Sequence, residues 1–332
     1  MSPEPENNSL NSSPRVAVLG AGAVGSYFGG MLARAGVDVT LIARPAHVEA
    51  IRRNGLFLDT VTFQEHVSVA ASTDVSAARD ADFVLFCVKT LDTEDAARSL
   101  APHLAPTATV VSLQNGVDNV PRIRAASGID ALPAVVYVAA ALPEPGHVKH
   151  SGRGELIVGE FAGAAHASPQ QPPRAERFAA LWAAAGVPCR LSPNIEVDLW
   201  TKMVMNCAGN AITAIAQTSF GNAARNAQTR EVMRMVIDEA VAVGRAAGVQ
   251  LPEAGWVEKG IKNAEGLGDA TSSMAQDIAR GKRTEIDSLN GYIVRRGTVL
   301  GVPVPVNSTL FALVKLIEEG LSPRGRTAAT SQ

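Results

Sequence analysis

Three polar side chains recur at four-residue intervals in the otherwise apolar stretch LWTKMVMNCAGN, residues 199–210. In an α-helix this spacing places Lys202, Asn206 and Asn210 on one slanted stripe, roughly opposite Val204 and Cys207. A lysine can polarise and protonate a carbonyl oxygen, and amides exchange hydrogen bonds with a ligand without adding charge. The alternative is a solvated helix face, although asparagine lowers helix propensity and a surface has little reason to prefer it to Glu or Lys.

A glycine-rich segment follows the strand-like run RVAVL and opens a helical stretch. It reads Gly20-Ala21-Gly22-Ala23-Val24-Gly25 and has the spacing G-x-G-x-x-G. The first glycine permits a tight turn, the second allows the backbone to approach a pyrophosphate, and the third allows close helix–strand packing. The helix N-terminus presents free N–H groups to the phosphates. The segment therefore predicts dinucleotide binding, with a purely structural glycine turn as the alternative.

A single arginine follows the second strand-like run, VTLIA. NAD-dependent enzymes place an Asp or Glu at this point to hold the ribose 2′-hydroxyl, but here the residue is Arg44 and the next carboxylate is Glu49. A guanidinium pairs with a 2′-phosphate and offers little to a neutral ribose. The sequence favours NADPH over NADH, with a surface arginine at a strand end as the alternative.

Two further strand-like runs also end in polar residues. Lys89 ends DFVLFCVK, and Gln114, Asn115 and Gly116 follow ATVVSL. In an open parallel sheet the ligand lies beyond the carboxyl ends of the strands, so these residues are expected where cofactor and substrate meet. Polar residues are common in such loops, and position alone is a weak argument for function.

The elements that must position these candidates begin with five short apolar runs: RVAVL, DVTLI, DFVLFCV, ATVVSL and PAVVYV. Such runs are typical of strands buried on both faces of a parallel sheet. A helix from Ala23 to Ala35, ended by Gly36, separates the first two, and ELIVGE at 155–160 indicates a further strand. This alternation predicts a doubly wound α/β domain. The segment 161–177, rich in Ala, Pro and Gln, is expected to be an exposed loop.

Beyond Ser192 the pattern becomes helical. Residues 230–248 form a periodic helix stopped by Gly248, and SSMAQDIAR and TEIDSLNGYIVRRG indicate two more helices separated by Gly281. We predict an α/β N-terminal Rossmann-like dinucleotide-binding domain plus an all-α C-terminal domain. The expected ranges are a disordered tail at 1–13, the NADP-binding domain at 14–192, a helical substrate and catalytic domain at 193–320, and a second tail at 321–332.

Composition narrows the classes of function. The chain has 332 residues, of which 46% are hydrophobic and 19% charged, and its net charge of −2 gives no electrostatic footprint for nucleic acid or an anionic membrane. Cys87, Cys189 and Cys207 are widely spaced in apolar contexts, so buried free thiols are expected rather than disulfides or a metal site. No long apolar run or signal-peptide pattern is present, and a cytoplasmic location is expected.

Taken in order, these motifs resemble those of the ketopantoate reductase (2-dehydropantoate 2-reductase) family. The matching segments are GAGAVGSYFGG, Arg44, CVKT, QNG, W-x-K-x-x-x-N-x-x-x-N (200–210) and SSMxQDxxxGxxTEIDxLNG (272–291), and together they cover residues 14–318. The first motif is shared with many dehydrogenases, whereas the last two are quite specific to this family and its close relatives. Residues 210–222 depart from the family pattern, so no role is carried over there, and the 161–177 loop is also unusual.

The resemblance implies a role for each matching residue. Lys202 matches the proton donor, and Glu285 matches a glutamate close to substrate and nicotinamide. Arg44 matches the 2′-phosphate arginine, and Lys89 a lysine on the cofactor side of the cleft. Asn115 matches an asparagine that touches both ligands. The remaining residues implied to bind substrate are Asn206, Asn210 and Ser273.

Two of these residues have simpler explanations from the sequence alone. TEID begins a predicted helix, where Thr284 could be the N-cap and acidic residues in the first turn are favoured by the helix dipole. Glu285 is therefore a candidate because of the resemblance, while Asp287 is expected to serve only the dipole. Asp277 lies one turn beyond Ser273 and could either orient a neighbour or be an exposed helix charge.

The resemblance implies an NADPH-dependent reduction of 2-dehydropantoate to (R)-pantoate, for pantothenate and coenzyme A synthesis, in a cleft between two domains. The alternatives are the reduction of another 2-oxo acid and, from a different class, a non-catalytic NADP-binding redox sensor. A sensor needs only the nucleotide end, so the presence of Lys202, Asn206, Ser273 and Glu285 together argues against it. A small-molecule substrate is expected, and the protein is expected to be a monomer or homodimer.

Overall fold

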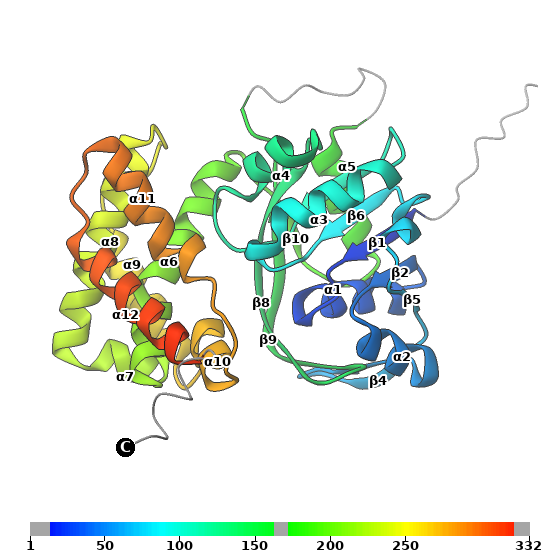
Figure 1. The fold of residues 1–332 in the computed structure, drawn as a ribbon, viewed down its shortest axis with the longest axis horizontal. Coiled ribbons are helices and arrows are strands. Elements are labelled where there is room, and N and C mark those ends of the chain that lie inside the picture. The colour runs from blue at the N-terminus through cyan, green and yellow to red at the C-terminus, as the bar shows by residue number, and fades with distance from the viewer. Residues whose placement is uncertain (1–13, 163–171, 322–332) are drawn as a thin grey trace, which may run out of the picture.

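The protein consists of a sheet with helices on both faces, followed by a bundle of helices (Figure 1). The structure is a computed structural model that describes residues 14–162 and 172–321. The strands are β1 (Arg15–Leu19), β2 (Asp38–Ile42), β3 (Leu56–Asp59), β4 (Gln64–Val67), β5 (Ala70–Ser72), β6 (Phe83–Phe86), β7 (Thr109–Ser112), β8 (Leu132–Glu144), β9 (His147–Val158) and β10 (Cys189–Leu191). The helices of the sheet half are α1 (Ala23–Arg34), α2 (Pro45–Asn54), α3 (Thr93–Leu100), α4 (Asn119–Ser127) and α5 (Arg174–Ala183), with 3₁₀ turns η1 (Val75–Ala78), η2 (Thr90–Asp92) and η3 (Ala101–His103).

Parallel strands form the centre of the sheet, as the apolar runs predict. The strand order is β4-β3-β9-β8-β7-β6-β1-β2-β5, with β10 beside β9. Strand β1 pairs in parallel with β2 and β6, and β6 pairs in parallel with β7. Alternate residues of β1 enter different cores: Val16 and Val18 pack with α1 and α5, while Ala17 and Leu19 pack with α3 and α4. The expected doubly wound α/β arrangement is confirmed.

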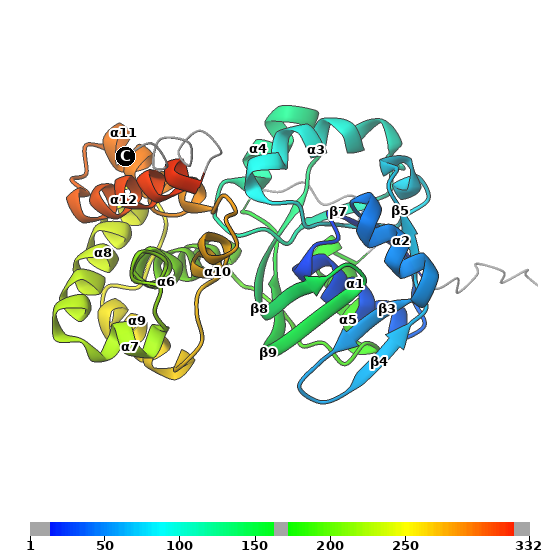
Figure 2. The same ribbon diagram turned by 60° about the horizontal axis from the view of Figure 1, so that its bottom comes forward.

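The other end of the sheet is antiparallel, which differs from the parallel sheet expected from PAVVYV and ELIVGE. Strand β8 pairs in parallel with β7 over only two residue pairs, and then runs antiparallel to β9 along most of its length. No helix separates β8 from β9, because Pro145 and Gly146 turn the chain directly and Gly146 takes a φ of +80°. Figure 2 shows this long hairpin beside β3 and β4.

The segment 161–177 is also not wholly a loop. Residues 163–171 lie outside the described part of the chain, but helix α5 already begins at Arg174. Its residues Ala175, Phe178 and Trp182 are buried against the sheet, so the apolar face beyond the proline pair is sufficient to start a helix. The expected tail at 1–13 and residues 322–332 of the expected tail at 321–332 lie outside the described residues. Leu321, expected in that tail, is instead the last residue of α12.

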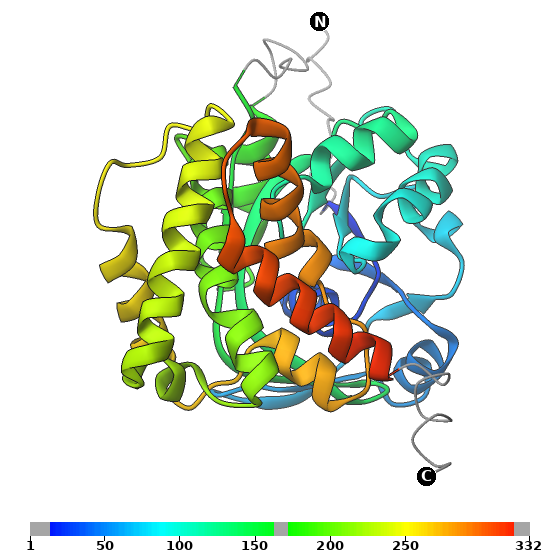
Figure 3. The ribbon, with the colours of Figure 1, turned by 60° about the vertical axis from the view of Figure 1, so that its left-hand side comes forward.

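The second half is helical, as predicted, and is arranged around one long central helix. This half comprises α6 (Ile195–Ala216), α7 (Phe220–Arg225), α8 (Ala227–Ala246), α9 (Trp256–Leu267), α10 (Ser273–Ala279), α11 (Asn290–Leu300) and α12 (Pro305–Leu321), with one 3₁₀ turn, η4 (Ile286–Ser288). Helix α6 packs against α8, α10 and α12 (Figure 3). Its apolar side, including Val204 and Cys207, is fully buried, as the stripe spacing requires.

The helix expected to start at TEID is broken. A 3₁₀ turn occupies Ile286–Ser288, and α11 starts only at Asn290. Thr284 does accept a hydrogen bond from the amide of Ile286 (3.1 Å), which resembles the expected cap. The break leaves Glu285 outside any helix, with its side chain directed toward the sheet half. In the described part of the chain, no helix is long and apolar enough to cross a membrane.

A buried histidine links three elements of the sheet half. His47, on α2, is 7% exposed; its Nδ1 accepts a hydrogen bond from the amide of Gly146 (2.8 Å) in the β8–β9 turn. Its Nε2 lies 3.0 Å from the hydroxyl of Ser26 on α1. Since Nδ1 is an acceptor, the ring is neutral with its proton on Nε2. Burial lowers the pKa of His47, because the charged form would lose its hydration.

This arrangement predicts a pH-dependent contribution to stability. The unfolded histidine has a pKa near 6.5, so the unfolded chain takes up a proton that folded His47 resists. The contribution is complete above about pH 6.5 and is lost as the pH falls through the lower, folded pKa. His47→Gln can still accept from Gly146 but cannot titrate. Urea unfolding at pH 7.5 and pH 5 should show a loss of stability that is about 1 kcal/mol smaller in the variant. Equal losses in both proteins would contradict this role.

Candidate active site

The glycine-rich segment has the geometry that its spacing predicts. Gly20 takes a φ of +84°, and a Cβ there would lie 2.7 Å from the amide of Val88. A Cβ on Gly25 would lie 2.8 Å from the Val18 side chain, so α1 packs directly on β1. A Cβ on Gly22, by contrast, would meet nothing closer than 3.9 Å. The open space at Gly22 is therefore where a phosphate group can approach the backbone.

The N-terminus of α1 is suited to an anion. No side chain caps it, and its first turn contains no acidic residue. The amide N–H groups at the start of the helix are thus available, and the helix dipole adds positive potential there. The segment Gly20–Gly25 consequently fits the diphosphate of a dinucleotide on the evidence of its own backbone.

Arg44 lies next to this phosphate site. The amides of Gly20 and Ala21 both donate to the carbonyl of Ile42 (3.0 and 2.9 Å), two residues before Arg44. Arg44 is exposed and is the N-cap residue of α2. Among residues 14–162 and 172–321 its guanidinium has no hydrogen-bond or ion-pair partner, so it is available to a ligand at the end of β2.

The ends of β6 and β7 face the helical half and contact it. Both carboxylate oxygens of Glu285 are held by the sheet half: Oε1 accepts from the amide and hydroxyl of Thr90 (3.3 and 2.9 Å), and Oε2 accepts from Nδ2 of Asn115 (2.9 Å). Lys89, beside Thr90, forms an ion pair with Asp277 on α10 (2.5 Å). The residues predicted from CVKT, QNG and TEID are thus brought together.

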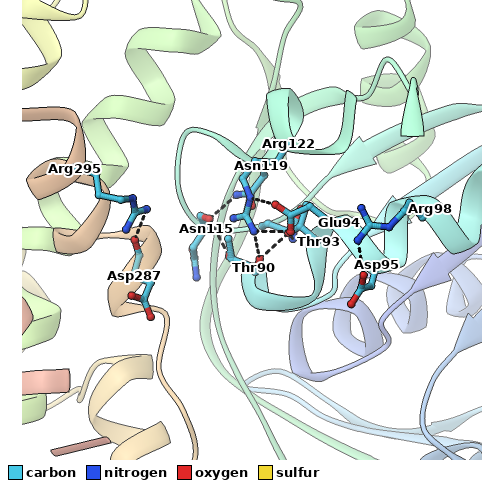
Figure 4. A network of polar contacts seen from close by, with 11 residues as sticks. Thr90, Thr93, Glu94, Asp95, Arg98, Asn115, Asn119, Arg122, Asp287 and Arg295 are labelled. Carbon is cyan, nitrogen blue, oxygen red and sulfur yellow. Dashed lines mark hydrogen bonds and ion pairs between the residues drawn. The ribbon is translucent and has the colours of Figure 1, made fainter. Parts of the chain in front are cut away.

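A polar network fixes the loops that hold Glu285 (Figure 4). Arg122 donates to both carboxylate oxygens of Glu94 (2.7 and 2.8 Å) and to the carbonyl of Thr90 (2.8 Å). Asn119 donates to the carbonyl of Asn115 (2.6 Å). The hydrogen bond from Arg122 lowers the pKa of Glu94, which keeps this pair charged. The loops that carry Thr90 and Asn115 are therefore supported by hydrogen bonds from α3 and α4.

The stripe on α6 is not a solvated face. Lys202 and Asn206 are half-buried and Asn210 is 5% exposed. The ammonium of Lys202 donates to the carbonyl of Val136 on β8 and lies 5.6 Å from the centre of the Tyr137 ring. Neither asparagine side chain has a hydrogen-bond partner within the described ranges. These unpaired amides are therefore available to bind a polar ligand.

The electrostatic surroundings make Lys202 a stronger acid than an ordinary lysine. Burial is the main cause, because it disfavours the charged ammonium; the negative charge of Glu285 opposes this effect, and the positive charge of Arg153 adds to it. The resulting pKa is about 8. Lys202 is therefore largely protonated at neutral pH but gives up its proton far more readily than a solvated lysine.

Ser273 lies at the start of α10, beside the stripe. The adjacent Ser272 is the N-cap, and its hydroxyl receives hydrogen bonds from Ala275 (3.0 Å) and from Thr213 on α6 (2.7 Å). Ser273 is exposed and its hydroxyl has no partner in the ranges that the structure describes. The two serines thus have different roles. Ser272 connects α10 to α6, and Ser273 remains available to a ligand.

Sequence reasoning missed some of these contacts. Thr90 provides two of the three donors to Glu285, and only its place after Lys89 in CVKT could have suggested it. Asp277, for which two roles were open, orients Lys89 of the sheet half through an ion pair. Tyr137 and Arg153 line the side of Lys202, and no motif marks them. In the described part of the chain, no cluster of His, Cys, Asp or Glu could hold a metal ion.

Comparisons with known proteins give consistent results. The family model described as ketopantoate reductase PanE/ApbA matches residues 16–163, and that of the PanE/ApbA C terminal matches residues 194–318. The chain is 38% identical over 307 residues to a 2-dehydropantoate 2-reductase from Archaeoglobus fulgidus, covering 92% of this chain and 99% of the relative. A PanE/ApbA family ketopantoate reductase from Ralstonia eutropha is 50% identical, with a TM-score of 0.84 over 92% of this chain and 99% of that one. A D-mandelate dehydrogenase, crystallised with NADH and anilino(oxo)acetate, shares the fold with a TM-score of 0.83 at 24% identity, over 92% and 99% of the two chains.

Two glycine variants separate the roles of the phosphate loop. In Gly22→Ala the added methyl enters open space, so stability should change little, while a dinucleotide should bind at least about tenfold more weakly. In Gly25→Ala the methyl would lie 2.8 Å from Val18, and this overpacking should cost about 1–3 kcal/mol of stability. Thermal unfolding and titration with NADPH measure the two effects. If Gly22→Ala binds NADPH as tightly as the parent protein, the backbone at Gly22 does not approach the phosphates.

Proposed function

The chain belongs to the ketopantoate reductase family, and from that premise we propose that it reduces 2-dehydropantoate to (R)-pantoate with NADPH, for pantothenate and coenzyme A synthesis. It is an oxidoreductase that acts on a CH–OH group and uses a nicotinamide dinucleotide. The single observation that best supports the reaction is the position of Lys202, a half-buried ammonium with a lowered pKa, on a stripe with two unpaired amides. The proposed division of labour assigns residues 14–192 to the cofactor and residues 193–320 to the substrate.

The preference for NADPH rests on Arg44. Its unpaired guanidinium stands at the end of β2, beside the phosphate loop, and no carboxylate occupies that position. A 2′-phosphate would gain a charge-assisted hydrogen bond there, whereas a neutral 2′-hydroxyl would gain little. Lys89, on the same side of the cleft, would add a second positive charge near the cofactor.

We assign to Lys202 the role of proton donor to the substrate oxygen. A nicotinamide cofactor held at Gly20–Gly25 would supply the hydride for the ketone carbon, and negative charge would then develop on the ketone oxygen. Lys202 keeps one N–H donor on the Val136 carbonyl and has two further donors for that oxygen, so it can polarise the carbonyl and then protonate it. The carboxylate of Glu285, held by Thr90 and Asn115, favours the charged form of Lys202 before the transfer.

Neutral groups complete the proposed substrate site. Asn206, Asn210 and Ser273 can donate to and accept from the hydroxyl and carboxylate oxygens of the substrate without adding charge. This suits a cleft that must also hold the phosphates of the cofactor. We assign Asn115 a contact with both ligands; its hydrogen bond to Glu285, which reaches from the sheet half to the helical half, supports this role.

Replacing Arg44 by Asp tests the cofactor preference. The variant loses a charge-assisted contact worth roughly 1.5–3 kcal/mol and gains repulsion toward the 2′-phosphate, so selectivity for NADPH over NADH should fall by at least about tenfold. Steady-state kcat/KM for both cofactors measures it. Arg53→Asp is the matched control, because it makes the same change of charge at the other, exposed end of α2. If Arg44→Asp leaves the ratio unmoved, or if both variants shift it equally, Arg44 does not recognise the phosphate.

Replacing Lys202 by Ala tests the reaction itself. Loss of a general acid should lower kcat for 2-dehydropantoate by about two to four decades. NADPH affinity should barely change, because the phosphate loop and Arg44 lie in the other half. Wild-type kcat should fall as the pH rises above about 8, where Lys202 loses its proton, and this limb should disappear in the variant.

Lys262→Ala is the control, since Lys262 is an exposed lysine on α9 in the same helical half. A folded Lys202→Ala enzyme with kcat within a fewfold of wild type would exclude the proposed acid. A wild-type enzyme that prefers another 2-oxo acid over 2-dehydropantoate by kcat/KM would keep the reaction type and replace the substrate.

A further inference from the structure

Arg153 has an unusual backbone conformation for its residue type. Its φ is +59°, and Gln217, at the end of α6, is the one other non-glycine residue with a positive φ in the described part of the chain. The pairing register of β8 and β9 shifts between Tyr137 and Val138, directly opposite Arg153 and Glu155, so Gly154 is an extra, bulged residue. A left-handed arginine in a strand costs free energy and persists only where its surroundings enforce it.

Tyr27 on α1 and His150 on β9 hold this bulge in place. His150 is buried; its Nε2 donates to the carbonyl of Arg153 (2.6 Å), and its ring stacks on Tyr27 with centroids 4.4 Å apart. A Cβ on Gly154 would lie 2.5 Å from the hydroxyl of Tyr27, so only glycine fits there. Bulges of this kind occur next to active sites, where they redirect a side chain.

The redirected side chain reaches the neighbourhood of Lys202. The guanidinium carbon of Arg153 lies 3.9 Å from the centre of the Tyr137 ring, and the ammonium of Lys202 lies 5.6 Å from the same centre. The two charges are therefore within about 10 Å of one another, a distance at which they interact appreciably in a partly buried site. Arg153 also donates twice to Oε1 of Glu155 (2.8 and 2.6 Å).

We propose that Arg153 is a positioning residue for the reduction: aimed by the β9 bulge at the Tyr137 ring, its positive charge weakens the hold of Lys202 on its proton. The proposal rests on the proposed role of Lys202 as the acid. Arg153 itself need not touch the substrate. Its effect is moderated by Glu155, which offsets part of its charge, and by solvent, because 43% of its side chain is exposed.

The charged groups around Lys202 are few and act in known directions. From β9, Arg153 disfavours the ammonium, and Glu155 counteracts Arg153. From the loop before η4, Glu285 favours the ammonium. On α6 itself, Asp198 lies one turn before Lys202 but is engaged by Arg190 (3.0 Å) and Ser192 (2.5 Å). Tyr137 on β8 is neutral, because burial raises its pKa further. Removing one β9 charge should therefore move the titration of Lys202 in a predictable direction.

Two substitutions should shift the titration in opposite directions. Arg153→Gln removes the repelling charge, so the high-pH limb of kcat should move up by roughly half a pH unit at low salt. Glu155→Gln leaves the charge of Arg153 uncompensated, and the limb should move down. Arg153→Lys, which keeps the charge, is the matched control and should stay close to wild type. Arg153→Gly relieves the positive φ, so it should shift the limb like Arg153→Gln without loss of thermal stability.

The titration of Lys202 can also be followed without the reaction. Acetic anhydride reacts only with the neutral amine, so the extent of Lys202 acetylation, measured by mass spectrometry across pH 6–10, reports its protonation directly. The pH at which acetylation of Lys202 is half-maximal should be lowest in Glu155→Gln and highest in Arg153→Gln. The wild type and Arg153→Lys should lie between them. Salt at about 1 M should compress these differences.

The outcomes separate the two proposals. The role of Lys202 as the acid is overturned if kcat of the wild type does not fall at high pH, or if the same fall persists in Lys202→Ala. A wild type with this fall, but with Arg153→Gln, Arg153→Gly and Glu155→Gln all titrating at the wild-type pH, overturns the role of Arg153 alone. A lower kcat in Arg153→Gln with an unmoved acetylation midpoint would also overturn it, because that result indicates only a structural defect.

Discussion

The carboxylate of Glu285 joins the two halves of the protein, and the arrangement of the site depends on this junction. Both of its oxygens accept hydrogen bonds from loops at the carboxyl ends of β6 and β7. Without these donors, the half-buried carboxylate would lose hydration and gain no hydrogen bonds in return, which costs free energy. The contact therefore holds the loops and the helical half in a fixed relative position. The same carboxylate stabilises the ammonium of Lys202. One group therefore both links the two halves and influences the charge state of Lys202.

On each side of this junction, hydrogen bonds from more distant elements support the residues that form it. On the helical side, the buried carboxylate of Glu318 on α12 accepts from the amide and hydroxyl of Thr284 (2.6 and 2.7 Å), the residue before Glu285. Lys315 then links Glu318 to Asp287 (3.0 and 2.9 Å). On the sheet side, Arg122 holds the carbonyl of Thr90. The carboxylate thus belongs to a chain of charged hydrogen bonds that extends from α12 to α4, which explains why the helix expected at TEID is interrupted there.

The sequence predicted those features that depend on local pattern. The G-x-G-x-x-G turn, the buried parallel strands and the helical periodicity of α6 each follow from neighbouring residues, and each is present. Features set by distant partners were not predictable in the same way. The β8–β9 hairpin contains the apolar runs PAVVYV and ELIV, which resemble parallel strands in sequence, and the bulge at Arg153 depends on Tyr27, more than a hundred residues earlier. Likewise, Thr90 and Asp277 are ordinary polar residues until the fold places Glu285 and Lys89 beside them.

The separation of Arg44 from the stripe on α6 has an evolutionary consequence. Arg44 follows β2 in the sheet half, whereas Lys202, Asn206 and Asn210 lie on α6 in the other half, and within the described residues no hydrogen bond or ion pair joins Arg44 to these three side chains. Substitutions at distant sites without shared partners act nearly independently. Under the proposed role of Arg44, a lineage with this fold can therefore exchange one nucleotide for the other by changes at the end of β2, with no compensating change on α6. Nucleotide preference is then free to drift, while the helix that carries the proposed acid stays under selection for the reaction itself.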